Sequence, residues 1–414
     1  MRFKLMGCVL AAGGVLVVGG AGPDDEAVSH VDWAEAEAPV LTYQARLTDP
    51  EMFIKAGEAY FSPDGHRVIF QAVEHPPEGE KPSPHYAMYV ADLTFKPNGE
   101  VAGLRNITRV SAPGSANTCG WFNPKDPSLI LFGSTMAPPK QEDAPGYQRG
   151  TSKYAWSFPR ETEIVSTHLP EDLATETVPE PKPIFERDGY DAEGSWSPDG
   201  RWILYTHAEP PKDGAAPDGD IWVYDTLTHA QLKLVAKPGY DGGPFFSPDG
   251  KRIIYRSDRN EDSLLQLYEG VLTFDDAGAI TGVEPEIKLT DDKNVNWAPF
   301  IHPYADLAVF ATSRLGHANY EVYAIDTTPD AAKAPADRVS VRVTRAAGFD
   351  GLPVFSRDGM FMMWTSQRAP EGTDQEAYIP SSQVWIARFN VAALRAKMFE
   401  AAMQKAAESH GQGG

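Results

Sequence analysis

The sequence repeats one short turn motif six times, and this repetition limits the fold more than any other feature. The motif reads aromatic-Ser-Pro-Asp-Gly at residues 61–65, 196–200 and 246–250, and Phe-Ser-Arg-Asp-Gly at 355–359. Weaker copies stand at 122–126 and 301–305. Pro presets φ for a turn, and Asp-Gly tolerates the tight geometry that follows. Recurring turns of one kind indicate a repeat architecture.

Each motif joins two short strands, and two further strands follow before the next copy. The second strands are apolar or β-branched, at residues 67–70, 202–205, 252–255 and 307–310. Third strands close with Asp, as at Asp225 and Asp326, and fourth strands often close with Thr, as at Thr108 and Thr344. Four antiparallel strands in about 55 residues are typical of a propeller blade. We therefore expect an all-β, six-bladed β-propeller.

The two ends of the repeat region complete one blade between them. The sixth unit ends with the strand at 384–388 and has no fourth strand of its own, whereas residues 42–48 supply a matching one ahead of the first unit. Pairing of the two would close the ring and remove exposed sheet edges. Residues 391–407 are rich in strong helix formers, which predicts a short C-terminal helix. The expected organisation is a signal peptide over 1–22, a linker over 23–40, the propeller over 41–390, and a helix with a tail over 391–414.

The N-terminal residues have the order of a secretory signal. Arg2 and Lys4 precede an apolar stretch over residues 5–18, small residues follow, and polarity changes at Pro23. This predicts a periplasmic or secreted protein, with an uncleaved anchor as the alternative. Only three residues separate Lys4 from Cys8, so a lipoprotein is the less favoured interpretation. No later apolar run reaches 18 residues, so no membrane span is expected after the signal is removed.

These motifs resemble the Pro-Asp-repeat, WD40-like propellers typified by TolB, over about residues 41–390. The resemblance implies the six-bladed fold and a binding role in the cell envelope. It extends to the propellers of prolyl-oligopeptidase-type enzymes and oligogalacturonate lyases, so the repeat is far more specific for fold than for function. TolB carries a separate α/β domain ahead of its propeller, and we expect this chain to lack one.

Charge and motifs limit the chemistry. The formal net charge is −21, which argues against binding to nucleic acid. Two cysteines in 414 residues cannot build a disulfide framework or a Cys-rich zinc site. The sequence also lacks a Gly-x-Ser-x-Gly nucleophile motif and a His-Glu-x-x-His metal motif. We therefore predict no catalytic residue.

Extra chain length is concentrated in the loops between second and third strands. These loops lie opposite the Ser-Pro-Asp-Gly turns, and we call the side that carries them the loop face and the other side the turn face. The longest run over about residues 74–85, 137–160, 209–219 and 369–380. Selective length on one face favours a binding surface there. In the 137–160 loop, Tyr147 and Trp156 stand beside cationic residues, which suits contacts with a glycan or a protein.

Polar residues recur at two further places near the loop face. Asp191, Asp241, Asn296 and Asp350 precede or begin innermost strands and are expected around the mouth of the central channel. There their oxygens suit Ca²⁺, or alternatively accept hydrogen bonds within local turns. Just past the second strands, Arg259, Arg314 and Arg368 suit an anionic ligand, or alternatively pair with the Asp residues. His207 is a further candidate binding residue. The predicted binding residues are therefore these acids, the amide of Asn296, the three arginines, His207, Tyr147 and Trp156.

The function most consistent with these patterns is a non-enzymatic binding or scaffold propeller of the cell envelope. It would hold an envelope protein or a glycan on the loop face, with no required cofactor and Ca²⁺ at the channel mouth as the one candidate. The alternative is a metal-dependent polysaccharide lyase or hydrolase that uses His75, His207 and the central Asp residues on the same face.

Overall fold

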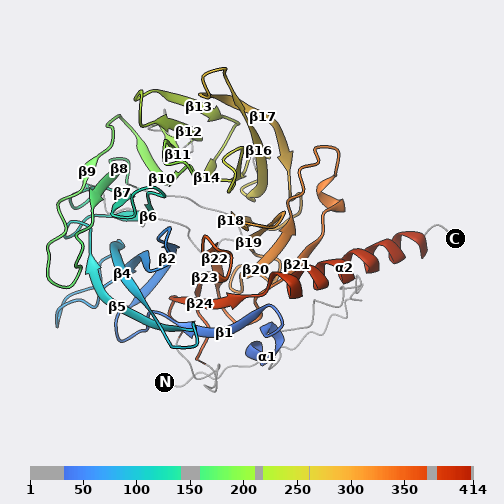
Figure 1. The fold of residues 1–414 in the computed structure, drawn as a ribbon, viewed down its shortest axis with the longest axis horizontal. Helices are drawn as coiled ribbons and strands as arrows, with labels where there is room; N and C mark the ends of the chain where they lie inside the picture. Colours follow the sequence, from blue (N-terminus) through green and yellow to red (C-terminus); the bar gives the residue numbers. More distant parts are fainter. Residues whose placement is uncertain (1–31, 141–158, 210–217, 261, 371–379, 412–414) are drawn as a thin grey trace, which may run out of the picture.

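The chain folds into a ring of six four-stranded antiparallel sheets, or blades, around a central axis, as the repeat predicts (Figure 1). This computed structural model describes residues 32–140, 159–209, 218–260, 262–370 and 380–411. The first strand of each sequence unit lies nearest the axis, and the fourth lies at the rim. The all-β, six-bladed prediction is confirmed.

The first three blades follow one another along the chain. Blade 1 contains β2 (Lys55–Phe61), β3 (Arg67–Val73), β4 (Ala87–Phe95) and β5 (Val101–Arg109). Blade 2 contains β6 (Asn117–Phe122), β7 (Leu129–Ser134), β8 (Glu163–His168) and β9 (Lys182–Pro183). Blade 3 contains β10 (Tyr190–Trp196), β11 (Trp202–Ala208), β12 (Gly219–Asp225) and β13 (Gln231–Val235).

The remaining blades complete the ring. Blade 4 contains β14 (Asp241–Phe246), β15 (Arg252–Ser257), β16 (Gln266–Phe274) and β17 (Ile280–Lys288). Blade 5 contains β18 (Asn296–Ile301), β19 (Leu307–Thr312), β20 (Glu321–Asp326) and β21 (Ser340–Arg342), with a 3₁₀ turn, η1 (Pro335–Asp337), ahead of β21. Blade 6 contains β22 (Asp350–Phe355), β23 (Phe361–Ser366), β24 (Gln383–Phe389) and the N-terminal strand β1 (Leu41–Arg46).

Strand β1 closes the ring, which confirms the predicted pairing of the two ends of the repeat region. It runs antiparallel to β24, with Thr42 opposite Arg388 and Arg46 opposite Trp385. The backbone N–H of Leu47 continues the contact by donating to Val384 O at 2.8 Å. The last blade therefore has its outer edge covered by a strand from the other end of the chain.

The Ser-Pro-Asp-Gly turns are held by the same small hydrogen-bond network in each strong copy. In blade 1 the Ser62 hydroxyl donates to Asp64 Oδ1 at 2.5 Å and accepts from the Arg67 backbone N–H at 2.8 Å. Gly65 takes a φ of +72°, which a residue without a Cβ adopts most readily. Ser197, Ser247 and Ser356 repeat the Ser–Asp bond at 2.5 Å. The motif therefore recurs because each of its residues has a fixed task in the hairpin turn.

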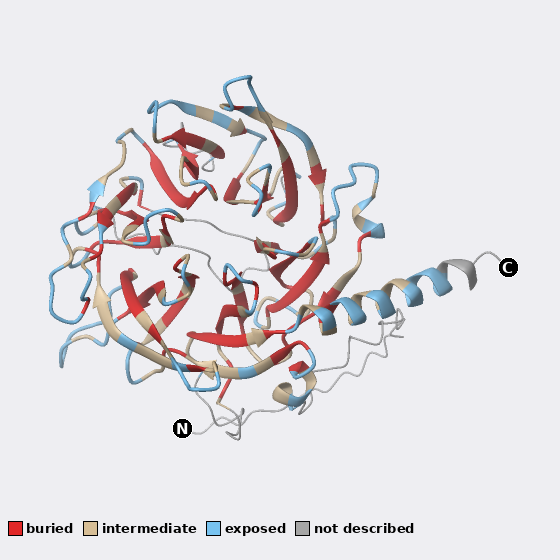
Figure 2. Ribbon diagram, in the orientation of Figure 1, coloured by how far each residue is buried: buried red, intermediate tan, exposed pale blue. Residues whose placement is uncertain are grey.

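Burial follows position in the blade. Figure 2 shows the inner strands largely buried, whereas most residues of the rim strands are intermediate, with exposed positions among them. Strand β11, for example, is buried at all seven residues, whereas β13 alternates between exposed and half-buried positions before ending buried. Blades therefore pack face against face through their inner three strands, and the rim contacts solvent.

Two helices flank blade 6. Helix α1 (Trp33–Glu37) precedes β1, within the segment that the sequence analysis assigned to a linker. Helix α2 (Val391–Gly411) follows β24, buries Leu394 completely against the blade 5–6 core, and then extends past the rim (Figure 1). In the part of the chain that the structure describes, neither helix has the length and apolar character needed to cross a membrane.

Candidate functional site

Every innermost strand carries a β-bulge at the same depth, and this bulge builds the wall of the central cavity. The antiparallel register shifts at this point in all six blades. One residue in each bulge has a positive φ and faces the axis. These residues are Glu58 (47°), Cys119 (50°), Glu193 (58°), Gly243 (57°), Ala298 (50°) and Leu352 (55°).

The cavity inside this ring has a volume of about 220 Å³ and lies at the loop-face end of the axis. Its outer lining includes Tyr86, Pro159 and Ser382, which stand where three of the long loops return to the blades. Its deeper lining includes Tyr60 and Phe245. The cavity therefore lies among the ends of the loops that the sequence predicts as a binding surface.

Aromatic rings fill the axis beneath the cavity. Tyr60, Trp121, Phe245 and Phe300 come from blades 1, 2, 4 and 5, with ring centroids 4.8 Å apart for Tyr60–Trp121 and 5.3 Å apart for Trp121–Phe245 and Phe245–Phe300. Trp121 and Phe300 belong to opposite blades, and their centroids are 6.1 Å apart. Since these contacts cross the axis, the cavity has an aromatic floor toward the turn face.

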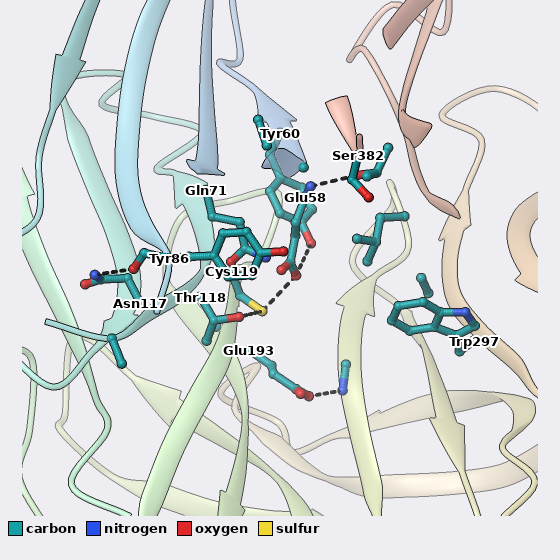
Figure 3. Close-up of a pocket in the computed structure, with 18 of the residues that line it drawn as sticks. Glu58, Tyr60, Gln71, Tyr86, Asn117, Thr118, Cys119, Glu193, Trp297 and Ser382 are labelled. Atoms are coloured by element: carbon teal, nitrogen blue, oxygen red, sulfur yellow. Dashed lines mark hydrogen bonds between the residues drawn. The ribbon is translucent and has the colours of Figure 1, made fainter. Parts of the chain in front are cut away.

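The wall from blades 1 to 3 is polar. Figure 3 shows Glu58, Cys119 and Glu193 on neighbouring strands, with Trp297 across the cavity. The Cys119 thiol donates to Glu58 Oε1 at 2.9 Å, and the Tyr60 hydroxyl donates to the same oxygen at 3.3 Å. Burial raises the pKa of the Glu58 carboxyl, and the nearby Glu193 charge adds to that rise. Burial and the Glu58 charge also hold the pKa of the Cys119 thiol well above its ordinary value.

Glu193 is fixed by groups from blades 3 and 4. Its carboxylate accepts from the Tyr240 hydroxyl at 2.6 and 2.7 Å, from the Thr206 hydroxyl at 2.8 Å and from the Gly243 backbone N–H at 2.5 Å. Arg256 Nη2 completes the set at 3.1 Å from Glu193 Oε1. A carboxylate with this many charge-assisted donors is a rigid, neutralised part of the wall.

The bulge positions of blades 4 to 6 are small or apolar, although Arg256 of blade 4 and Thr365 of blade 6 also line the cavity. Gly243, Ala298 and Leu352 occupy the bulge positions there, and Trp297 and Phe349 stand beside them. Gly243 leaves room for Arg256, because a Cβ at this position would meet the Arg256 guanidinium and displace it. The carboxylates and the thiol therefore come from blades 1 to 3, and Trp297, Ala298, Phe349 and Leu352 give blades 5 and 6 most of the apolar lining.

Gln71 adds a buried amide to the polar wall of blades 1 to 3 (Figure 3). Gln71 is 8 % exposed, and its Oε1 atom has no hydrogen-bond partner among the residues that the structure describes. A buried carbonyl oxygen without a partner costs free energy in an empty protein. It is therefore the kind of group that a bound ligand satisfies.

The predicted ring of acids and amides lies two residues before the bulge in each strand, and it is buried. Asp191, Asp241 and Asn296 are 0 % exposed and Asp350 is 1 % exposed. Asn296 donates to Gln266 Oε1 and Asp292 Oδ1, at 3.1 and 2.9 Å. Burial raises the pKa of Asp241 to about 6. The structure places these four side chains in contacts within and between strands of their blades.

The predicted arginines lie beside those acids. Arg259 Nη2 is 3.2 Å from Asp241 Oδ1, and Arg368 Nη2 is 2.7 Å from Asp350 Oδ2, so two of the pairs that the sequence analysis gave as an alternative are formed. Arg314 Nη2 is instead 3.1 Å from Asp292 Oδ2. These guanidinium groups therefore connect strands of the blades.

His207 lies in the same kind of contact in blade 3. Its Nδ1 is 2.9 Å from Asp191 Oδ1 and 3.0 Å from Arg187 Nε, and the residue is 5 % exposed. His75 is separate from it, with Nε2 2.7 Å from the backbone oxygen of Pro50. Among the described residues, no three His, Cys, Asp or Glu side chains converge as a metal site. Tyr147 and Trp156 lie outside the described residues.

Sequence reasoning did not identify the cavity residues Glu58, Gln71 and Cys119. The bulge position holds a different residue type in most blades, so it leaves no repeated letter in the sequence. The signal that was available is indirect: each bulge residue stands at a constant distance before a motif turn, as Glu58 does before Ser62 and Glu193 before Ser197, whereas Gln71 follows the turn and has no such signal.

Comparisons with known proteins give a likeness of fold. No protein-family model matches the chain, and no curated protein matches it. Among solved structures, one described as TolB from Agrobacterium tumefaciens is 16 % identical, with a TM-score of 0.46 over 81 % of this chain and 91 % of that one. TolB from Acinetobacter baumannii is 17 % identical, with a TM-score of 0.46 over 79 % of this chain and 64 % of that one. An oligogalacturonate lyase from Vibrio parahaemolyticus is 10 % identical, with a TM-score of 0.43 over 84 % of this chain and 94 % of that one.

Proposed function

We propose that this chain is an exported, non-enzymatic binding protein of the cell envelope, and that the central cavity on its loop face holds part of its partner. The partner is an envelope protein or a glycan. The observation that carries the proposal is the cavity of about 220 Å³ with a closed aromatic floor and a buried, unpartnered amide, Gln71, in its wall. A pre-formed concave site with few convergent polar groups is the usual form of a ligand site.

The loops support the same surface. Tyr86, Pro159 and Ser382 line the cavity, and each follows one of the long connections between second and third strands. A partner that enters the cavity therefore passes these described loop ends. Such an arrangement combines a rigid anchor site with variable surroundings.

The state of the cavity side chains favours binding over covalent catalysis. The raised pKa keeps the Cys119 thiol protonated near neutral pH, and the thiolate is the nucleophilic form. Glu193 is already held by four donor groups of the protein. These groups instead give the cavity a fixed shape and polarity.

The test is to fill the cavity with a side chain that the fold already accepts. Ala298→Leu reproduces in blade 5 the residue that blade 6 carries at the same bulge position, Leu352, with nearly the same φ. Ala277→Leu, on the exposed β16–β17 turn, is the matched control. Thermal unfolding of the three proteins is measured against a panel of alkyl and aryl amines, carboxylates and neutral sugars.

At least one class should raise the melting temperature of the wild type and of Ala277→Leu but not of Ala298→Leu. The proposal fails if no class stabilises the wild type, or if filling the cavity leaves every shift unchanged.

A further inference from the structure

The cavity lining contains two carboxylates, Glu58 and Glu193, and two cations, Lys55 and Arg256, but the two carboxylates are not held alike. Glu193 is paired with Arg256 at 3.1 Å, whereas Glu58 receives hydrogen bonds only from a thiol and a phenol. Both of those bonds go to Glu58 Oε1, so Oε2 accepts none from the described residues. Lys55 lines the mouth, but its Nζ lies 4.4 Å from the centroid of the Tyr86 ring and makes no ion pair with Glu58 among the described contacts. Glu58 therefore forms no ion pair with a described residue, although the nearby Arg256 charge opposes the rise that burial gives to its pKa.

A second acceptor belongs to the same strand pair. Gln71 lies opposite Gly57 in the β2–β3 ladder, and Gly57 is the residue before Glu58. The Gln71 Oε1 atom has no hydrogen-bond partner in the described part of the chain. Two unpaired acceptors on one wall call for a donor with several N–H or O–H groups. An ammonium group supplies three N–H donors and a positive charge.

The opposite wall selects the rest of the ligand. Trp297 and Leu352 on that wall, and Phe245 in the floor, present carbon surface to the cavity. Aromatic faces also attract cations, and Arg256 already lies with its guanidinium carbon 5.9 Å from the Trp297 ring centroid. A hydrophilic polycation would leave this wall without complementary contact, and a neutral apolar molecule would leave Glu58 and Gln71 unpaired.

From this geometry we propose that the cavity binds an organic monocation, with its ammonium group on Glu58 Oε2 and Gln71 Oε1 and its apolar body against Phe245, Trp297 and Leu352. This inference rests on the proposed function, because it gives the chemistry of the group that the cavity holds. Two sources supply such a group: a free amine, or the amino end of a partner chain that begins with an apolar residue.

The test uses calorimetric titration of the full chain with 2-phenylethylammonium, and with 2-phenylethanol as its neutral counterpart of nearly equal shape. The ammonium should bind the wild type at least 10-fold more tightly than the alcohol. Glu58→Gln, which keeps size and removes the charge, should weaken the ammonium about 10- to 100-fold and leave the alcohol unchanged. Glu35→Gln makes the same change at an exposed carboxylate of α1, outside the cavity lining; it is the matched control and should change either affinity less than 3-fold.

The comparison of the two probes on the wild type keeps the inference open to refutation even if Glu58→Gln does not fold. Equal binding of the ammonium and the alcohol, or an unchanged ammonium affinity in Glu58→Gln, would overturn the monocation. Such a result leaves the proposed function standing if Ala298→Leu still abolishes binding of some compound class. Failure of every class in the panel, by contrast, overturns both.

A third arm distinguishes the two sources. The peptide amide Phe-Gly-Gly-Gly and its N-acetyl form carry the same apolar residue with and without a free amino group. Tighter binding of the free peptide than of 2-phenylethylammonium, lost on acetylation, supports the amino end of a partner chain. Tighter binding of 2-phenylethylammonium than of either peptide supports a free amine.

Discussion

Arg368 and Glu37 form an ion pair with Nη1 and Oε2 2.8 Å apart, and neither side chain is exposed to solvent. Arg368 Nη2 also lies 2.7 Å from Asp350 Oδ2. The guanidinium carbon is 4.6, 4.9 and 5.6 Å from the ring centroids of Trp33, Trp364 and Trp385. Glu37 belongs to α1 and Arg368 follows β23, so this pair ties the N-terminal helix to the blade that closes the ring.

Breaking this pair should destabilise the whole ring. Glu37→Gln leaves a buried guanidinium with one carboxylate instead of two, and removal of one partner of a buried pair costs about 3–5 kcal/mol. Glu35→Gln, on the exposed side of the same helix, is the control and should change the free energy of unfolding by less than about 0.5 kcal/mol. Denaturant unfolding measures both, and equal stability of the two variants would contradict the structural role of the pair.

A methyl group at Gly243 should disturb the polar wall of the cavity. The added Cβ would lie 1.9 Å from Arg256 Nη1 and would displace that guanidinium from Glu193, in addition to the strain of a positive φ. Gly278 also has a positive φ, 76°, but open space around it, so Gly278→Ala measures the strain alone. Gly243→Ala should therefore lower the free energy of unfolding by about 1–3 kcal/mol more than Gly278→Ala does. A smaller loss for Gly243→Ala would show that Arg256 is not held where the structure places it.

Blade 4 contains a buried carboxyl whose titration should lower stability as pH rises. Burial raises the pKa of Glu269 to about 7, although Arg252 Nη1 lies 2.6 Å from its Oε1. Since the folded pKa exceeds the ordinary value of 4.5, this group's contribution is complete below pH 4.5 and is lost as pH rises through 7. The loss is on the order of 3 kcal/mol.

Glu269→Gln removes that titration along with the ion pair, so its absolute stability is not the informative quantity. The free energy of unfolding is measured at pH 5 and at pH 8. It should decrease less between these two pH values in the variant than in the wild type. Parallel pH profiles for the two proteins would refute the raised pKa.

The export proposal predicts the N-terminus of the protein in its native cells. The basic, apolar and small-residue segments end at about residue 22, ahead of Pro23. Mass spectrometry of the protein from an envelope or extracellular fraction should therefore find a chain that starts near residue 23. A chain that retains Arg2 and Lys4 and stays in the cytoplasmic fraction would contradict export.

The sequence predicts the architecture well because the turn motif carries its own mechanism. Ser62, Asp64 and Gly65 each perform a local task in the hairpin, so the same letters recur wherever the hairpin does. Closure of the ring was also predictable, because the strand missing from the last unit was matched by an extra strand ahead of the first unit.

The candidate site was not predictable in the same way, because it depends on how six blades meet. Asp241 recurs in type with Asp191 and Asp350, so it drew attention, yet its strand register buries it against Arg259. Glu58 and Cys119 come together because the bulge in each of their strands turns these side chains toward the axis. The bulge position has no constant residue type, so a single sequence does not show which side chains meet at the axis.

The most direct test of the cavity as a ligand site is the reactivity of Cys119, which lines it and is a free thiol. Labelling of Cys119 by methyl methanethiosulfonate is followed by peptide mass spectrometry, with and without saturating 2-phenylethylammonium. The account predicts slow labelling of the free protein, because the thiol pKa is raised, and at least a 10-fold further decrease when the amine is bound. Labelling at the same rate with the amine bound as without it would contradict the account.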